Sequence, residues 1–301
     1  MFGGLKNIFY KLFGSRICPL IIFGLMKLLR HLFAFYINSS IHVALAVVAL
    51  TFITVLEYGI TISTQLLMFI FFGAITGYNF VKYAKIAGLH HRHLAHSLKA
   101  IQIFSAICFL ILLFAAFHLP LKLLLIAGCF GVPTFFYAVP LIRHKNLRSL
   151  TGIKIFIVAF VWGGITVIVP ITAAGADISG DVLLTFFQRM TIVVALMIPF
   201  EIRDVPYDAL NLKTLPQQIG VWGTKMLGEG ILLICLVFEF LKENTDLAYL
   251  SSLFVFSVIL GGLLIISKPY QSRYFASFWI EGTPILWWIL YVLLKNTQVL
   301  G

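Results

Sequence analysis

A succession of long apolar segments constrains the fold of this chain more than any other feature. Each segment is about as long as the roughly 20 apolar residues that a helix needs to cross a bilayer. Only 11% of the residues are charged, against about 25% in soluble domains, which excludes a water-soluble enzyme with a single anchor. We therefore predict an all-α integral membrane protein with nine transmembrane helices, at residues 38–56, 62–81, 100–117, 122–140, 154–171, 184–200, 226–241, 248–267 and 276–294.

The segment before the first predicted span combines apolar and basic residues. Residues 1–36 have no clear cleavage site of a signal peptide, and their pattern favours a basic amphipathic helix in the membrane interface. Residues 37–301 are predicted to form one transmembrane domain. A disulfide scaffold is excluded, because the four cysteines lie singly in apolar stretches.

The formal charge of +11 records membrane topology. Eighteen of the 22 Lys and Arg residues fall on one side of the predicted spans. Since basic residues concentrate in cytoplasmic loops, we expect a cytoplasmic N-terminus and an external C-terminus. A bacterial inner membrane is the expected location, with membrane lipid rather than nucleic acid around the chain.

The connection after the sixth predicted span carries the most chemistry. Glu201, Asp204 and Asp208 recur at spacings of three and four, so they share one face if the helix continues. Carboxylates of this kind bind Mg²⁺ together with substrate phosphates, and Arg203 and Lys213 add groups suited to phosphate oxygens. Spacing alone also allows a solvated loop that merely ends the span.

Two further connections on the same side are polar. The one at 78–99 contains the amide and basic residues Asn79, Lys82, Lys85, His90, His91, Arg92, His93, His96 and Lys99. It is consistent with attraction to anionic lipid, with an anion-binding site, or with a histidine metal site. The one at 135–154 has basic residues that positive-inside placement alone explains. Together the three connections favour a polar cavity that faces the cytoplasm and has an apolar floor.

Two of these connections resemble the UbiA-like intramembrane prenyltransferases. The family's second aspartate-rich motif, R-D-x-x-x-D followed by a basic residue, T-L-P and Gly, matches Arg203, Asp204, Asp208, Lys213, Thr214, Leu215, Pro216 and Gly220. The family's Tyr-Ser-x-x-P loop with trailing basic residues is similar to the stretch with Tyr137, Pro140, Arg143 and Lys154. The resemblance covers about residues 40–295 and implies a UbiA-like bundle of nine helices.

The resemblance also implies a reaction, the transfer of a prenyl group from a prenyl diphosphate to a lipophilic acceptor. Catalytic roles then fall to Asp204, Asp208 and Tyr137, and Mg²⁺ ligation to Glu201, Asp204 and Asp208. Contacts to the substrate are expected from Asn79, Lys82, Arg92, Arg143, Lys154, Arg203 and Lys213.

The sequence departs from the family at the first aspartate-rich motif, N-D-x-x-D-x-x-x-D. Asn79 matches, but Phe80, Tyr83 and Ala87 stand at the aspartate positions. One hypothesis is that Lys82, with its basic neighbours Lys85 and Arg92 and the histidines, holds the diphosphate directly. The alternative is a catalytically silent relative that binds an isoprenoid lipid or a partner membrane protein. A transporter is less favoured, because no internal repeat or broken-helix pair is evident.

Two charged residues lie within predicted spans. Arg189 and Glu281 are costly in hydrocarbon unless they meet partners or water. Because both fall near predicted helix ends, we expect them at the membrane interface.

Overall fold

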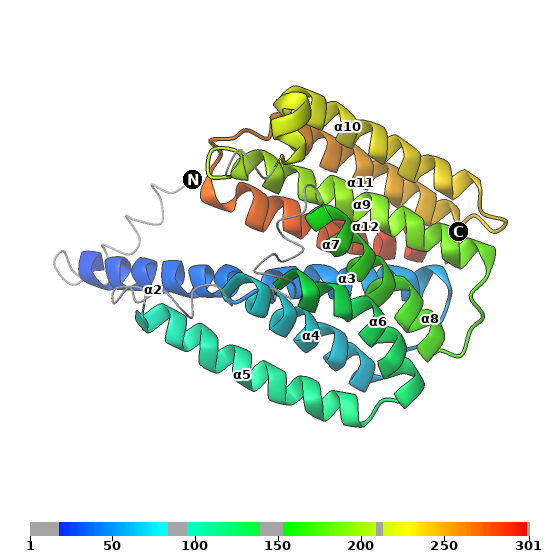
Figure 1. The fold of residues 1–301 in the computed structure, drawn as a ribbon, viewed down its shortest axis with the longest axis horizontal. Coiled ribbons are helices and arrows are strands. Elements are labelled where there is room, and N and C mark those ends of the chain that lie inside the picture. Colours follow the sequence, from blue (N-terminus) through cyan, green and yellow to red (C-terminus); the bar gives the residue numbers. More distant parts are fainter. Residues whose placement is uncertain (1–17, 84–94, 139–152, 209–212, 300–301) are drawn as a thin grey trace.

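The structure is a computed structural model that describes residues 18–83, 95–138, 153–208 and 213–299, and every regular element in these ranges is helical (Figure 1). The elements are α2 (Cys18–Asn38), α3 (Ile41–Glu57), α4 (Thr64–Tyr83), α5 (Ala95–Phe117), α6 (Leu121–Ala138), α7 (Ile153–Gly163), the π-helical η4 (Gly164–Ile168), α8 (Val169–Ala173), α9 (Gly180–Asp204), α10 (Leu215–Phe240), α11 (Leu247–Ile266), the π-helical η6 (Phe275–Ile280) and α12 (Glu281–Val299).

The helices close into a ring. Going around it, α3 packs on α4, then come α6, α7, α9, α10, α11 and α12, and α12 returns to α3. Helix α5 lies outside the ring against α4 (Figure 1). The shared core includes Leu50, Ile192, Phe256 and Trp287 from four of the ring helices. Closure places α12, near the end of the chain, against α3, near its beginning. Residues from the η6–α12 region therefore join the site described below.

The outer surface of the ring is apolar. Large side chains such as Phe117, Leu110, Leu233 and Phe254 are exposed along the outer helices. Exposed apolar surface of this extent is typical of contact with lipid. Among the described residues, seven helices are long and apolar enough to cross a membrane, or eight if the bent pair α2–α3 is one span. The multi-pass membrane class is therefore confirmed. A ninth crossing stays a prediction, because α6 has a shorter apolar stretch.

Helix α10 begins well before the predicted start at residue 226. The Gln217 side chain accepts a hydrogen bond from the backbone N–H of Thr214 at 3.0 Å, and Pro216 lies in the first turn. Both features start helices. Gly220 then interrupts the helix with φ of 75°, a left-handed value that favours glycine. The T-L-P-Q-Q segment is therefore a helix start rather than part of the connection.

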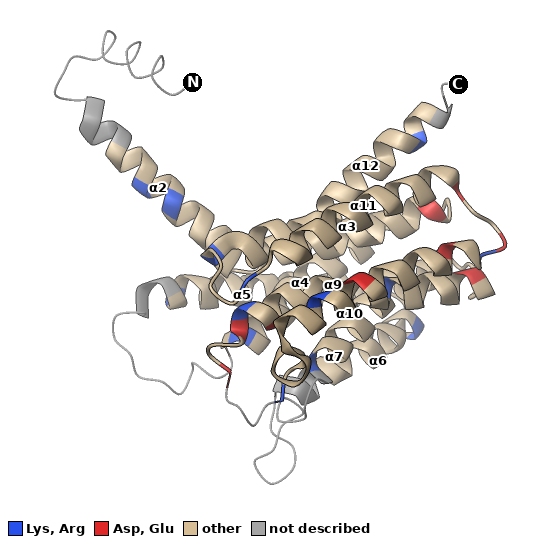
Figure 2. Ribbon diagram, turned by 90° about the horizontal axis from the view of Figure 1, so that it is seen from above, with Lys and Arg blue, Asp and Glu red and all other residues tan. Residues whose placement is uncertain are grey.

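Helix α2 extends away from the bundle (Figure 2). It is bent by 55° from α3, and between the two Ser40 has a left-handed backbone with φ of 64°. Its side chains from residue 23 to residue 32 are exposed. The structure describes only this later part of the predicted amphipathic segment, and its placement in the membrane interface stays a prediction.

Candidate functional site

A polar cavity of about 420 Å³ opens at one end of the ring, which we call the cavity end. Within the described part of the chain, its charged lining consists of four basic residues, Lys82, Lys154, Arg203 and Arg273, and two acidic residues, Asp204 and Glu281. They come from α4, α7, α9 and the η6–α12 region, so four segments distant in sequence meet there. The excess of basic groups makes this cavity attractive to an anion.

The last turn of α9 positions the acidic groups. Glu201 is buried and accepts a hydrogen bond from Lys154 Nζ at 2.9 Å. Arg203 Nε donates to Asp204 Oδ1 at 2.8 Å. The backbone N–H of Asp208 bonds the carbonyl of Asp204 at 3.0 Å, so these two aspartates stand one helical turn apart despite Pro206. The turn thus offers carboxylates and guanidinium side by side.

The cavity becomes apolar away from its mouth. Tyr78 lies about one turn inward from Lys82 on α4, and its hydroxyl accepts a hydrogen bond from Trp162 Nε1 at 2.8 Å. Glu281 follows Arg273 in the chain by about two helical turns, and both residues line the cavity. The remaining inner wall is formed by the side chains of Val43, Val193, Leu196, Met197 and Ile280. An occupant with an anionic head and an apolar body fits this gradient.

Two further cavities extend the site sideways. A compartment of about 350 Å³ shares Tyr78, Lys154 and Trp162 with the polar cavity. It shares Gly73 and Gly77 with a third, mostly apolar cavity of about 710 Å³ between α4, α5 and α6. The three cavities therefore adjoin one another and lead from the basic mouth toward the peripheral helix α5.

The structure brings four of the sequence-predicted site residues together in the polar cavity: Lys82, Lys154, Arg203 and Asp204. Glu201 joins them through its contact with Lys154. Asp208 stands on the adjoining turn and is not among the lining residues.

The other predicted site residues lie elsewhere or are not described. The Asn79 side chain is buried among Ser39, Ser40 and Ser105, to which it hydrogen-bonds, and it lines the apolar cavity. Lys213 is exposed on a left-handed backbone. Arg92 and Arg143 lie outside the described residues, as do the histidines at 90, 91 and 93. The His96 and Tyr137 side chains are likewise not described, although their backbones belong to α5 and α6.

Sequence reasoning missed Arg273, Glu281 and Tyr78 as members of the site. Arg273 is one of the eighteen basic residues that were counted only for membrane topology, and Glu281 was expected at the membrane interface. Glu281 lines the polar cavity, and its placement at the membrane interface stays a prediction. The available signal was a carboxylate inside an apolar segment, which usually marks a functional position.

The expectation for Arg189 is wrong. Helix α9 begins at Gly180, so Arg189 lies inside the ring and is 1% exposed. Its Nη1 donates to the carbonyl of Leu50 at 2.8 Å, and its guanidinium lies 5.3 Å from the ring centre of Trp287. A buried arginine is therefore accommodated by a carbonyl and an aromatic face.

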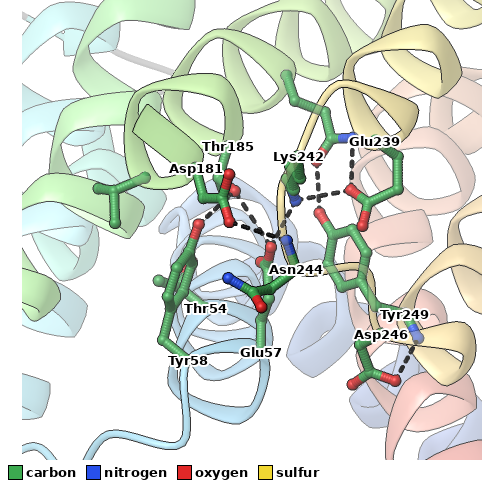
Figure 3. Close-up of polar contacts among 12 residues, drawn as sticks. Thr54, Glu57, Tyr58, Asp181, Thr185, Glu239, Lys242, Asn244, Asp246 and Tyr249 are labelled. Atoms are coloured by element: carbon green, nitrogen blue, oxygen red, sulfur yellow. Dashed lines mark hydrogen bonds and ion pairs between the residues drawn. The ribbon is translucent and has the colours of Figure 1, made fainter. Parts of the chain in front are cut away.

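A buried ionic network occupies the opposite end of the ring (Figure 3). Lys242 Nζ lies 2.6 Å from both Glu57 and Glu239, and the lysine and Glu239 side chains are each 1% exposed. Gln188 donates to Glu239 at 3.2 Å and accepts a hydrogen bond from the Tyr249 hydroxyl at 2.7 Å. The network joins α3, α9, α10 and α11 at this end. Its charges pair with one another inside the bundle, whereas those of the polar cavity line an open space.

Asp246 caps α11 beside this network. Burial raises the pKa of its carboxyl, but hydrogen bonds from the Tyr291 hydroxyl and the Ala248 N–H, with the charge of Lys295, outweigh burial and lower it. Because the folded pKa is depressed, the stabilisation is complete above the unfolded value of about 3.9 and is lost as the pH falls through the lower folded value.

We therefore predict that Asp246→Asn, which keeps a capping oxygen but removes the negative charge that the Tyr291 hydroxyl and Lys295 contact, lowers the free energy of unfolding at neutral pH by about 1 kcal/mol. The difference from the parent protein should shrink as the pH falls from about 5 toward 2. Chemical denaturation in detergent micelles across this pH range measures it. A difference that is constant with pH would contradict the assigned role of the carboxylate.

By sequence the chain matches no protein-family model and no curated protein significantly. Its fold is similar to that of a digeranylgeranylglyceryl phosphate synthase in membranes, with a TM-score of 0.52 and 14% identity. The match covers 86% of this chain and 94% of that protein. At this identity the likeness shows the fold alone, and at that level the resemblance stated from the motifs is confirmed.

Proposed function

We propose that this membrane protein, which shares its fold with a digeranylgeranylglyceryl phosphate synthase, transfers a prenyl group from a prenyl diphosphate to a lipophilic acceptor. One observation carries the proposal: the cavity combines a basic mouth with an apolar interior that adjoins two further cavities. A prenyl diphosphate changes in the same way along its length, from an anionic diphosphate head to an apolar chain.

The basic mouth supports recognition of the diphosphate. Arg203 and Arg273 present guanidinium groups that match pairs of phosphate oxygens, and Lys82 and Lys154 add point charges. Charge-assisted hydrogen bonds of this kind are about twice as strong as neutral ones. Direct binding by basic groups also fits the loss of the first aspartate motif, where Lys82 follows Asn79 and Phe80.

The residues present suit one Mg²⁺ ion better than two. Asp204 and Asp208 stand one turn apart and would hold the ion together with substrate oxygens. Glu201, the third predicted ligand, is already bound by Lys154. When bound, Mg²⁺ would neutralise the diphosphate and make it a better leaving group.

The inner part of the cavity would hold the reacting carbon and the acceptor. Apolar walls exclude water from an allylic cation, which water would otherwise trap. Glu281 lies at this depth and is the group placed to accept the proton that the acceptor releases. The predicted catalytic role of Tyr137 stays a prediction.

A second function is favoured by one contact. Asp204, a predicted metal ligand, is already paired with Arg203 at 2.8 Å. A cavity that neutralises its own carboxylate can bind an isoprenoid diphosphate without cleaving it. The second candidate is therefore a catalytically silent lipid-binding relative.

Turnover of labelled prenyl diphosphates distinguishes the two functions. The protein, reconstituted in nanodiscs, is incubated with radiolabelled geranylgeranyl diphosphate, Mg²⁺ and a membrane lipid extract. We expect release of diphosphate and transfer of label to lipid, with at least a tenfold loss in Asp204→Asn and little change in Asp181→Asn, whose carboxylate lies at the other end of α9.

Each alternative has its own result in this assay. Stoichiometric binding without release of diphosphate would identify the silent lipid-binding protein. Neither binding nor release, across donors of different chain length, would overturn the proposal.

A further inference from the structure

A separate groove lies on the outer face of the ring between α10 and α11. It encloses about 420 Å³, and its polar side chains are Glu229 on α10 and Ser257 on α11. The rim is apolar and faces outward: Leu233 and Val258 are 64% and 60% exposed. Among the residues that the structure describes, the groove shares no lining residue with the polar cavity at the end of the ring.

The polar atoms in this groove have no partner within the described part of the chain. Glu229 Oε1 and Ser257 Oγ are buried without a hydrogen bond. The Ser257 residue is 6% exposed, so its hydroxyl is recessed beneath the rim. Gly261 makes room for the carboxyl, since a Cβ at this position would lie 2.7 Å from Glu229 Oε2. A buried polar group without a partner normally costs about 1–3 kcal/mol, which calls for an external partner.

The depth of these atoms in the membrane restricts that partner. Glu229 stands near the middle of α10 and Ser257 near the middle of α11. Both therefore lie far from the membrane surfaces, where phospholipid headgroups remain. An acidic side chain facing hydrocarbon at this depth is rare and usually functional. The partner must be apolar overall and carry a small polar group.

We propose that the groove binds a lipophilic alcohol or phenol. A hydroxyl is the group that donates to the Glu229 carboxyl and accepts from Ser257 Oγ at the same time. The apolar body of the ligand would lie against Leu233 and Val258. The volume is within the range of about 300–1,000 Å³ that small-molecule sites occupy. The recessed polar atoms favour a slender ligand over a transmembrane helix, which would pack on the rim above them.

Photoaffinity labelling tests this site. The full chain in nanodiscs is irradiated with a long-chain primary alcohol that carries a diazirine and an alkyne, and labelled peptides are identified by mass spectrometry. We expect labelling of α10 and α11 peptides that an excess of the plain alcohol suppresses. The methyl ether of the probe, which cannot donate a hydrogen bond, should label these peptides several-fold less, up to about tenfold, as expected for loss of one hydrogen bond of about 0.5–1.5 kcal/mol.

Variants assign the label to the two polar residues. Glu229→Leu and Ser257→Ala should each reduce labelling severalfold, whereas Glu229→Gln keeps an acceptor oxygen and should retain more. Ile234→Ala, which changes an exposed residue of α10 outside the groove, should label like the parent protein. If Glu229→Leu does not fold, the test uses Glu229→Gln instead. In this variant the alcohol should still label the peptides more than the methyl ether does, and equal labelling would contradict the proposal.

Three results would overturn the proposal. They are equal labelling by alcohol and ether, undiminished labelling in a folded Glu229→Leu protein, and exclusion of the probe by a second copy. The last would appear as disulfide cross-linking between copies through Val258→Cys, and it would identify the groove as a dimer interface. None of these outcomes depends on the prenyl transfer proposed above.

Discussion

Replacing Lys242 with methionine is expected to destabilise the protein by about 3–5 kcal/mol, the cost of leaving a buried charge without its partner. Lys242 Nζ lies 2.6 Å from both Glu57 and Glu239, and these three side chains are at most 8% exposed. Methionine preserves the length and apolar contacts of the side chain but leaves two carboxylates facing each other. Thermal and denaturant unfolding in detergent micelles measure the loss.

Two further variants make this prediction specific. Lys122→Met removes an exposed lysine at the start of α6 and should change stability by less than about 0.5 kcal/mol. The triple variant Glu57→Gln, Glu239→Gln, Lys242→Met removes all three charges and should recover most of the stability, because no buried charge is left unpaired. A Lys242→Met protein as stable as the parent would contradict the network drawn in Figure 3.

Replacing Arg203 with methionine is expected to weaken binding of geranylgeranyl diphosphate by about 10- to 100-fold. A hydrogen bond to a charged group contributes about 1.5–3 kcal/mol, and each 1.4 kcal/mol is a factor of ten in affinity. The change also releases Asp204, whose carboxylate Arg203 holds at 2.8 Å, and so adds repulsion toward the diphosphate. Calorimetric titration in EDTA isolates this direct contribution from any metal.

The control comes from the connection between α11 and η6. Lys268→Met removes an exposed basic residue that does not line the cavity, and binding should change by less than about twofold, consistent with a screened surface charge. In Arg203→Met/Asp204→Asn the released carboxylate is gone, so part of the affinity should return. Unchanged binding in Arg203→Met would contradict the proposal that the basic mouth of the cavity binds the diphosphate.

The same titration tests the role of Mg²⁺. If basic groups alone hold the diphosphate, binding by the parent protein persists in EDTA. Binding that disappears in EDTA would show that the ion is essential for recognition, and would assign Asp204 and Asp208 the main role.

Much of the helical arrangement is predictable from sequence. Apolar segments near 64–83, 154–173 and 247–266 are helical because hydrocarbon offers the backbone no other hydrogen-bond partner. The start of α10 was missed, because the T-L-P-Q-Q stretch is too polar to be counted with the span. There the local contact of Gln217 with the Thr214 backbone outweighs hydropathy.

The site was predictable only in part. Arg203 and Asp204 stand out as polar residues after an apolar segment, whereas Lys82 and Lys154 entered the predicted site through the comparison with the prenyltransferase motifs. Arg273 was missed as a site residue because nothing local distinguishes it from other basic residues at helix ends. Its place in the cavity follows from ring closure, which packs α12 against α3.

The sequence by itself determined that this chain is a multi-pass membrane protein, because the transfer of a segment into hydrocarbon depends on that segment's own composition. It also marked the basic and acidic connections from which the candidate site is built. Only the tertiary structure decided which charges from distant segments meet: Lys154 with Glu201, and Lys242 with Glu57. The physical reason is that ion pairing and burial depend on which helices become neighbours. In this ring those neighbours are often more than a hundred residues apart in the chain.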